Sequence, residues 1–301
     1  MSLERMTERC ILTVHAHPDD ESSKGAATIA RYASEGVRTV LVCCTGGEAG
    51  EILNDAADSE EARTDLTAVR ARELDAAVKI IGYHAVYKLG YRDSGMPGTE
   101  ANAHPDNFHN ADLDDATGRL VRIIRAEHPQ VVVSYDWDYG RGHPDHIRVH
   151  QIGHLAFERA GDPTWYPEHG QPWTPLKLYY TGVFTRRRVE KLHAWFEERG
   201  EESPYREWMA RWTERESDPT RAAPKPITTQ IDVGDWLHVT RDALAAHATQ
   251  VPSSSAWFQV PIDVQRTIYP WEDYTLAASR VGGPVLTANA GTEDDLFAGV
   301  D

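Results

Sequence analysis

Two short stretches of the sequence concentrate imidazole and carboxylate side chains. The first, HPDDE, covers residues 17–21, and the second, HPDH, covers residues 143–146. Acid and imidazole groups packed this densely attract cations and are common protein ligands of divalent metals. A metal bound by such groups can acidify water for hydrolysis. We therefore predict that both stretches contribute to a metal site.

The predicted fold brings these two stretches together. Each follows an apolar run that is typical of a buried strand, at residues 10–16 and 130–136, and each leads into a helix. Open α/β sheets bind ligands beyond the carboxyl ends of their strands, and in the Rossmann order the binding crevice lies between the first and fourth strands. The glycines of a dinucleotide-binding turn are missing from the first stretch, and its acids would repel a phosphate.

Each stretch also has a simpler interpretation. Asp20 or Ser22 could cap a helix, and the histidines of residues 143–146 could lie in water at the start of a surface helix. A cap needs only one acid or hydroxyl, however. Two such clusters at one crevice are more specific than either alone and favour the metal site.

Strands and helices alternate along the first half of the chain, which is typical of a parallel sheet. The expected strands are residues 10–16, 37–47, 85–91 and 130–136, and the expected helices are residues 22–36, 61–82, 113–129 and 143–161. Continuous apolar strands indicate a sheet covered on both faces. We predict an α/β fold with a Rossmann-like, doubly wound, mostly parallel sheet and a C-terminal α/β cap region.

Beyond residue 160 proline and tryptophan become common and the pattern loosens. Here we expect a strand at 177–183, helices at 186–200 and 203–216, an edge strand at 227–233 and a last helix at 236–250. Residues 1–160 are expected to form a Rossmann-like catalytic core that carries both metal motifs. Residues 161–301 are expected to complete the sheet and cap the substrate site.

Composition limits the partners of this protein. The chain has 31 basic and 47 acidic residues among 301, a net charge of −16, which disfavours nucleic acid and anionic membranes as partners. Its three cysteines form no CxxC pair, which favours a reducing compartment, and no apolar run reaches membrane-spanning length. We expect a cytoplasmic protein that acts on a small molecule. The sequence leaves a homo-oligomer open.

The two motifs resemble those of a known family. AHPDDE after a strand, with HPDH more than a hundred residues later, resembles the LmbE-like (PIG-L) zinc-dependent N-deacetylases and amidases, which act on glucosamine-containing substrates. The resemblance covers most of the chain. TGGEAGEILN, RDSGMPG, PLKLYY, AHATQ and EDDLFAG are most similar to the mycothiol S-conjugate amidase branch, which includes homologues from antibiotic pathways. This implies hydrolysis of a thiol-sugar conjugate into glucosaminyl-inositol and an N-acetylcysteine S-conjugate.

The resemblance also implies a metal-ligand set. His17, Asp20 and His146 match the zinc ligands of the family, with one coordination position left for water or substrate. Two neutral histidines and one carboxylate suit a catalytic zinc, because three protein ligands with an open position are the usual catalytic arrangement. Ferrous iron binds the same set, so ligand type does not separate Zn²⁺ from Fe²⁺.

Two further residues match catalytic positions of the family, and a third is the candidate partner of one of them. Asp19 resembles its general base, beside a ligand yet off the metal. His143 resembles the residue that, when protonated, steadies the oxyanion or protonates the leaving amine. Asp145 is the expected hydrogen-bonding partner of His143.

The substrate-binding residues form a looser set. Glu51, Arg70 and Asp93 fall where the family contacts the sugar and inositol, and Lys24 resembles the lysine of the amidase branch. Arg70 and Lys24 could equally be solvated helix charges. Relatives often carry a tyrosine two residues before HPDH. Here that position is Arg141, and either Arg141 or the nearby Tyr139 could replace the phenol.

Two rival functions and two secondary features stay open. An N-acetylglucosaminyl-inositol deacetylase would use the same mechanism, and a noncatalytic sugar-binding zinc protein would close the metal site with a fourth protein ligand, usually Cys. His247, in the AHATQ motif, is kept as a rim residue of the site. Cys43 and Cys44 lie in an apolar strand and are expected to be unreactive.

Overall fold

A single seven-stranded sheet runs through the molecule. The computed structural model describes residues 8–136, 142–217, 225–281 and 292–300. The strand order is β3-β2-β1-β4-β5-β7-β6. The strands are β1 (Cys10–His15), β2 (Arg38–Thr45), β3 (Ala85–Tyr91), β4 (Val131–Ser134), β5 (Lys177–Gly182), β6 (Thr229–Asp232) and β7 (Trp271–Ser279).

The first five strands are parallel, and the order reverses at β1. This strand pairs with β2 on one side and with β4 on the other, with Leu12 opposite both Val40 and Val132. The predicted α/β class is confirmed, and the strand order reverses between the first and fourth strands, where the crevice was predicted. All six residues of β1 are buried, as expected for a strand with helices on both faces.

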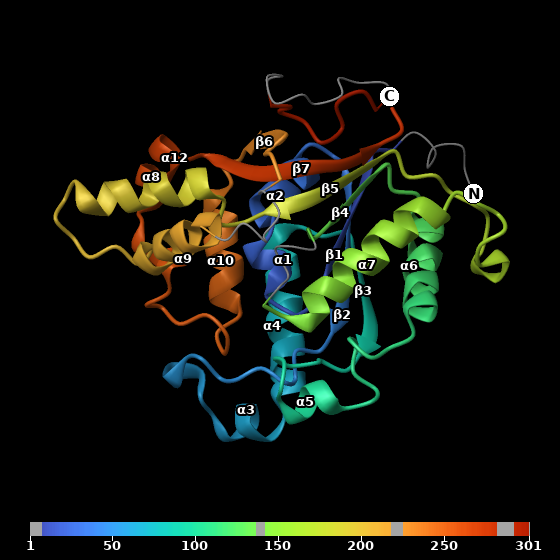
Figure 1. Cartoon of the computed structure of the whole chain (residues 1–301), viewed down its shortest axis with the longest axis horizontal. Coiled ribbons are helices and arrows are strands. Elements are labelled where there is room, and N and C mark those ends of the chain that lie inside the picture. The colour runs from blue at the N-terminus through green and yellow to red at the C-terminus, as the bar shows by residue number, and fades with distance from the viewer. Residues whose placement is uncertain (1–7, 137–141, 218–224, 282–291, 301) are drawn as a thin grey trace.

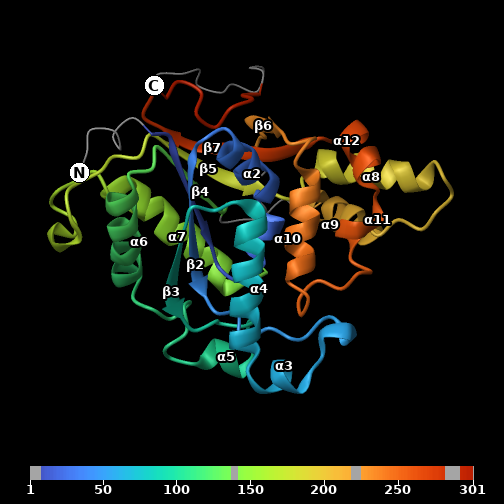
Figure 2. The ribbon, with the colours of Figure 1, turned by 180° about the vertical axis from the view of Figure 1, so that it is seen from behind.

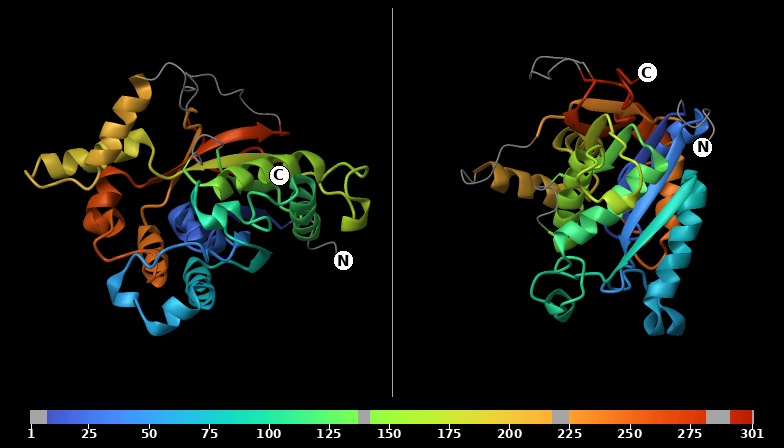
Figure 3. Two further views of the ribbon diagram at one scale, coloured as in Figure 1. Left: turned by 60° about the horizontal axis from the view of Figure 1, so that its bottom comes forward. Right: turned by 90° about the vertical axis from the view of Figure 1, so that its right-hand side faces the viewer.

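Helices cover both faces of the sheet. α6 (Leu113–Glu127) and α7 (Pro144–Arg159) lie on one face (Figure 1). α2 (Ala26–Ser34), α4 (Leu66–Ile81) and α10 (Leu237–Ala246) lie on the other, which faces the viewer in Figure 2. The side view on the right of Figure 3 shows the sheet between these two layers.

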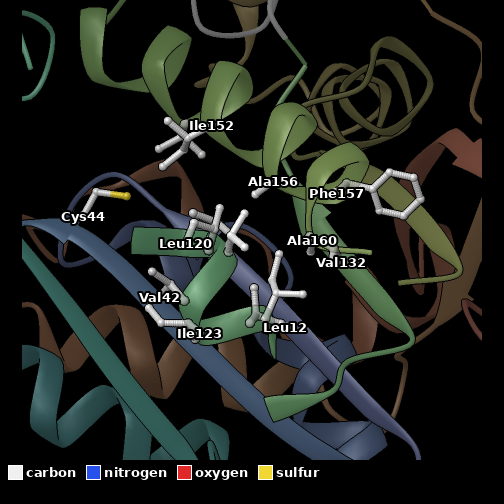
Figure 4. Packing of buried hydrophobic residues seen from close by; sticks show 14 of the residues in the cluster. Leu12, Val42, Cys44, Leu120, Ile123, Val132, Ile152, Ala156, Phe157 and Ala160 are labelled. Carbon is white, nitrogen blue, oxygen red and sulfur yellow. The ribbon is translucent and has the colours of Figure 1, made fainter. Parts of the chain in front are cut away.

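One of the two large core clusters fills the space between the sheet and the α6–α7 layer. Leu12 and Val42 of the sheet meet Leu120 of α6 and Ile152 of α7, and all four are buried (Figure 4). Burying a side chain of this size stabilises the fold by about 1.5–3 kcal/mol. This packing fixes α7, and therefore the HPDH segment at its start, against the sheet.

Two predicted helices are each divided in two. The helix expected at 22–36 consists of α1 (Asp20–Ser23) and α2, separated at Gly25, whose φ of +106° stops the helix. A Cβ at Gly25 would also lie 2.8 Å from the Tyr274 hydroxyl. The helix expected at 61–82 consists of α3 (Glu60–Thr64) and α4, because the Asp65 side chain caps α4 by accepting from the backbone N–H of Ala68.

The C-terminal part of the chain completes the sheet. β5 continues it in parallel, and the edge strand predicted at 227–233 is β6. β7 was not predicted, and it runs antiparallel between β5 and β6. The division of the chain at residue 160 stays a prediction, since one sheet includes strands from both sides of it.

A separate helical group lies beside the sheet, after the end of β5 and before the start of β7. It contains α8 (Arg186–Glu197), α9 (Arg206–Ser217), α11 (Ala256–Gln259) and α12 (Ile262–Ile268), visible on the right in Figure 2. Val189, Leu192, Phe196, Tyr205 and Val260 form its own buried cluster. The remaining short helix is α5 (Glu100–Ala103), and 3₁₀ turns lie at Asp55–Ala57 and Pro167–His169. Among the described residues, none of the helices is long and apolar enough to span a bilayer.

Candidate active site

The two motifs meet at the carboxyl ends of β1 and β4. His17 follows β1, and Asp20 opens α1 directly after it. On the other side, His143 is the N-cap of α7 with Pro144 at the first helical position, which places His146 in the first turn. The predicted convergence is confirmed, because His146 contacts Asp20, although the two lie 126 positions apart in the chain.

Three side chains present donor atoms with metal-site spacing. Asp20 Oδ2 lies 3.4 Å from His17 Nδ1 and 3.4 Å from His146 Nε2. Ligand atoms about 2.0–2.1 Å from a tetrahedral zinc ion are about 3.4 Å apart. His17, Asp20 and His146 therefore fit a single divalent ion, and they are the ligand set expected from the sequence.

The other face of the His17 ring contacts a second pair of carboxylates. Nε2 lies 3.2 Å from Asp145 Oδ2 and 3.6 Å from Asp93 Oδ1. Asp145 is itself fixed by Ser94, whose backbone N–H donates to Oδ2 at 3.0 Å and whose hydroxyl donates to Oδ1. If Nδ1 of His17 binds a metal, its Nε2–H is the donor to Asp145, an arrangement that orients metal-binding histidines.

The Asp145 carboxylate therefore has a different partner from the one predicted. It was expected to pair with His143, yet its Oδ2 lies 3.9 Å from His143 Nδ1 and only 3.2 Å from His17. His17, Asp93, His143 and Asp145 also form a set of donor atoms that could hold a cation. This second set shares His17 with the first through the opposite ring nitrogen.

His143 is held as a neutral hydrogen-bond donor. The backbone N–H of Asp145 donates to its Nδ1 at 3.3 Å, which places the ring proton on Nε2, and Nε2 lies 3.7 Å from Asp93 Oδ1. Burial and the nearby His17 lower the pKa of His143 to about 4. The ring therefore offers an N–H group without carrying a charge, which corrects the expectation of a protonated His143.

Asp19 lies beside the ligand set with an unusual backbone. Its φ is +112°, a region that L-residues rarely adopt, and its N–H donates to Glu21 Oε2 at 2.9 Å. The side chain is 29% exposed, so it reaches the crevice. Loss of hydration raises the pKa of Asp19, against the opposing charge of Arg70. A carboxylate with a raised pKa is a better proton acceptor.

Arg70 is not a solvated helix charge. Only 3% exposed, it donates to the Gly47 carbonyl at 2.7 Å, to the Pro18 carbonyl, and to Asp19 Oδ2 at 3.1 Å. Gly47 has a φ of +69°, and a Cβ there would overlap the guanidinium. Arg70 therefore ties Asp19 and the preceding Pro18 to the loop after β2. Its predicted contact with substrate stays a prediction.

The remaining predicted residues are more scattered. Lys24 pairs with Asp20 Oδ1, the carboxylate oxygen that faces away from the two histidines, and also donates to Ser23. Glu51 has an exposed side chain in the loop after β2. Tyr139 and Arg141 lie outside the described residues, so the structure does not choose between them.

Comparisons with known proteins agree with this geometry. The family model described as PIG-L: GlcNAc-PI de-N-acetylase matches residues 12–157, which include both motifs. The mycothiol S-conjugate amidase of Streptomyces coelicolor is 44% identical over 295 residues, covering 96% of this chain and 97% of the relative. The chain belongs to the PIG-L family. It is thus a metal-dependent enzyme of the deacetylase and amidase class.

Further relatives of this PIG-L protein have deacetylase names. A 1D-myo-inositol 2-acetamido-2-deoxy-alpha-D-glucopyranoside deacetylase of Thermobispora bispora is 40% identical, covering 98% of this chain and 100% of the relative. The solved N,N'-diacetylchitobiose deacetylase of Pyrococcus horikoshii is 17% identical with a TM-score of 0.60, covering 90% of this chain and 84% of that one. The last likeness supports the fold.

Sequence reasoning missed one buried pair in this PIG-L site. His247, expected at the rim, is fully buried, and its Nε2 donates to Glu21 Oε1 at 2.6 Å. Nearby, Glu73 of α4 accepts from both the N–H and the hydroxyl of Thr249, each at 2.7 Å. His247 lies 226 positions from Glu21 in the chain, so no local pattern could have paired the two residues.

Proposed function

We propose that this enzyme hydrolyses the amide that joins glucosamine to an S-conjugated N-acetylcysteine in mycothiol-type conjugates. The observation that carries the proposal is the position of Asp19, a carboxylate that Arg70 holds beside a His17–Asp20–His146 ligand set. The choice of substrate is supported by the Streptomyces coelicolor amidase, with which the chain shares 44% of its residues over nearly its whole length.

The ligand set defines where the chemistry takes place. A divalent ion held by His17, Asp20 and His146 would polarise the amide carbonyl and lower the pKa of a water molecule. Zinc suits two imidazoles and one carboxylate with an open position. A closed structural zinc site usually includes cysteine ligands. The donor sets found among the described residues contain none, which supports a catalytic site over a noncatalytic one.

Asp19 moves the proton in this proposal. It accepts a proton from the attacking water and then passes it to the departing amine nitrogen, so that the proton lost by water ends on the leaving group. The raised pKa of Asp19 suits both transfers, because the group holds the proton between them. Arg70 keeps the carboxylate at the crevice.

His143 stabilises the charge that develops on the carbonyl oxygen. Its Nε2–H is available as a donor because Nδ1 already accepts from Asp145, and burial keeps the ring neutral. A preorganised donor of this kind lowers the barrier through the charge that appears in the transition state. Asp93, Glu51 and Lys24 are proposed to bind the sugar hydroxyls.

Product analysis tests the proposal. The purified enzyme with measured zinc and iron content is given a panel of glucosamine amides, including a mycothiol S-conjugate and the N-acetylated glucosaminyl-inositol. We expect one equivalent of zinc and faster release of amine from the S-conjugate. Faster release of acetate would instead assign the enzyme as an inositol-sugar deacetylase, and no amine release from any amide would overturn the proposed function.

A further inference from the structure

We infer that His247 is a positioning residue for the base Asp19 and that it acts through Glu21. The Glu21 carboxylate joins two segments 226 residues apart in the chain. One oxygen, Oε1, accepts from His247 Nε2 at 2.6 Å, and the other, Oε2, accepts from the backbone N–H of Asp19 at 2.9 Å. His247 thereby reaches the base without touching it.

The contact with Asp19 is made where its backbone most needs support. A φ of +112° is unfavourable for an aspartate, so Asp19 would relax to another conformation if its N–H were released. Such a change would turn the Asp19 side chain away from the crevice. The Glu21 oxygen is the partner that the structure gives this N–H.

Both members of the pair are shielded from water. Glu21 is 1% exposed and His247 is 0% exposed, so solvent does not replace either hydrogen bond when one partner is removed. Ser22 adds a second donor to Glu21 Oε1, at 2.5 Å. The carboxylate is therefore held in one orientation by two neighbours and holds Asp19 with its remaining oxygen.

The segment that carries His247 is itself rigidly placed. His247 is the C-cap of α10, and two residues later Thr249 makes its two hydrogen bonds to Glu73 of α4. The same segment is also hydrogen-bonded to the loop after β2, since the Thr249 carbonyl accepts from the backbone N–H of Leu53. The C-terminal half of the chain thus reaches the catalytic base through the His247 imidazole and the Glu21 carboxylate.

Four variants separate positioning from general stability. His247→Leu removes the donor and His247→Gln retains an amide donor near the Nε2 position. Ser22→Ala is a milder change, which removes only the second donor to Glu21 Oε1. Tyr32→Phe is the matched control, because it deletes a buried hydroxyl that donates to Asp295 and accepts from the N–H of Leu296, both at 2.8 Å, outside the catalytic site.

The experiment measures kcat, KM and zinc content of the full-length enzyme, together with amide hydrogen exchange of the peptide that contains Asp19. For His247→Leu we expect kcat to fall about 10- to 100-fold with KM and zinc content unchanged. Exchange at the Asp19 peptide should become faster. His247→Gln should recover most of the activity, Ser22→Ala should lie between, and Tyr32→Phe should lower only the melting temperature.

Several outcomes would overturn the inference. These are an unchanged kcat in His247→Leu, an equal loss in Tyr32→Phe, a loss that follows zinc content, or no recovery in His247→Gln. If His247→Leu does not fold, an unchanged kcat and exchange rate in Ser22→Ala would have the same effect. The inference rests on the proposed function for its kcat readout. A wild-type enzyme inactive on every amide refutes that function, whereas unchanged exchange at Asp19 refutes the inference alone.

Discussion

His17 Nε2 lies 3.2 Å from Asp145 Oδ2, although 128 residues separate them in the chain. This contact turns the opposite nitrogen of the ring toward Asp20, at 3.4 Å. Asp145 is fully buried and fixed by two hydrogen bonds from Ser94. The carboxylate therefore determines the orientation of an imidazole that could bind the metal.

Removing the charge of Asp145 should weaken metal binding. In Asp145→Asn the His17 ring loses a charged acceptor, and we expect the zinc affinity to fall about 10- to 100-fold. Competition with a chromogenic chelator measures this change. Asp75→Asn, on the exposed face of α4, is the control and should bind zinc as the wild type does. An unchanged affinity in Asp145→Asn would show that the His17 contact does not support the metal site.

Asp19→Asn should separate metal binding from hydrolysis. Asparagine tolerates a positive φ better than most residues, so the backbone at this position is retained while the proton acceptor is lost. We expect full zinc content and a kcat lower by a factor of about 10² to 10⁴. Steady-state amine release together with metal analysis checks both parts. Wild-type turnover in this variant would assign the base to another group.

Alanine substitutions at two glycines test whether the close packing of Arg70 against Gly47 supports the site. Gly47 and Gly200 have similar positive φ values of +69° and +68°, but a Cβ at Gly47 would overlap the Arg70 guanidinium, and nothing lies within 4 Å of a Cβ at Gly200. Gly200→Ala should lower the free energy of unfolding by about 1–2 kcal/mol from backbone strain alone. Gly47→Ala should lower the free energy of unfolding by more than Gly200→Ala does. Its kcat should also fall, because Arg70 holds Asp19. Urea unfolding and assays of both variants compare them, and equal losses would contradict the argument.

The three cysteines should be inert in the folded enzyme. Burial raises the pKa of Cys10 to about 12 and the pKa values of Cys43 and Cys44 well above their usual range. We expect almost no iodoacetamide labelling at pH 8 in the native protein and complete labelling in denaturing urea, measured by mass spectrometry. Rapid native labelling of Cys43 or Cys44 would place a reactive thiol next to the site.

The parallel half of the fold could be predicted because its signals are local. Continuous apolar strands, caps and the position of Pro144 all follow from neighbouring residues. β7 was missed because its burial follows no simple alternation, with Asp273 and Tyr274 buried side by side and the rest half-buried or exposed. Its place in the sheet depends on pairing with β5 and β6, which a local pattern does not encode.

The metal ligands could be predicted because both motifs resemble those of the family and the predicted strand order brings them together, while the residues that support them could not. His17 and Asp20 share one turn, and the strand order brings His146 to them. The links from Asp145 to His17 and from His247 to Glu21 join residues more than a hundred positions apart. A helix arginine such as Arg70 looks solvated in the sequence, and only the fold reveals the three acceptors that bury it.

X-ray absorption at the zinc edge tests most directly whether His17, Asp20 and His146 share one ion. The account predicts a shell of nitrogen and oxygen only, about 2.0–2.1 Å from zinc, with two imidazoles in the wild type and one or none in His146→Ala. A sulfur scatterer at about 2.3 Å, or a spectrum unchanged in His146→Ala, would contradict it.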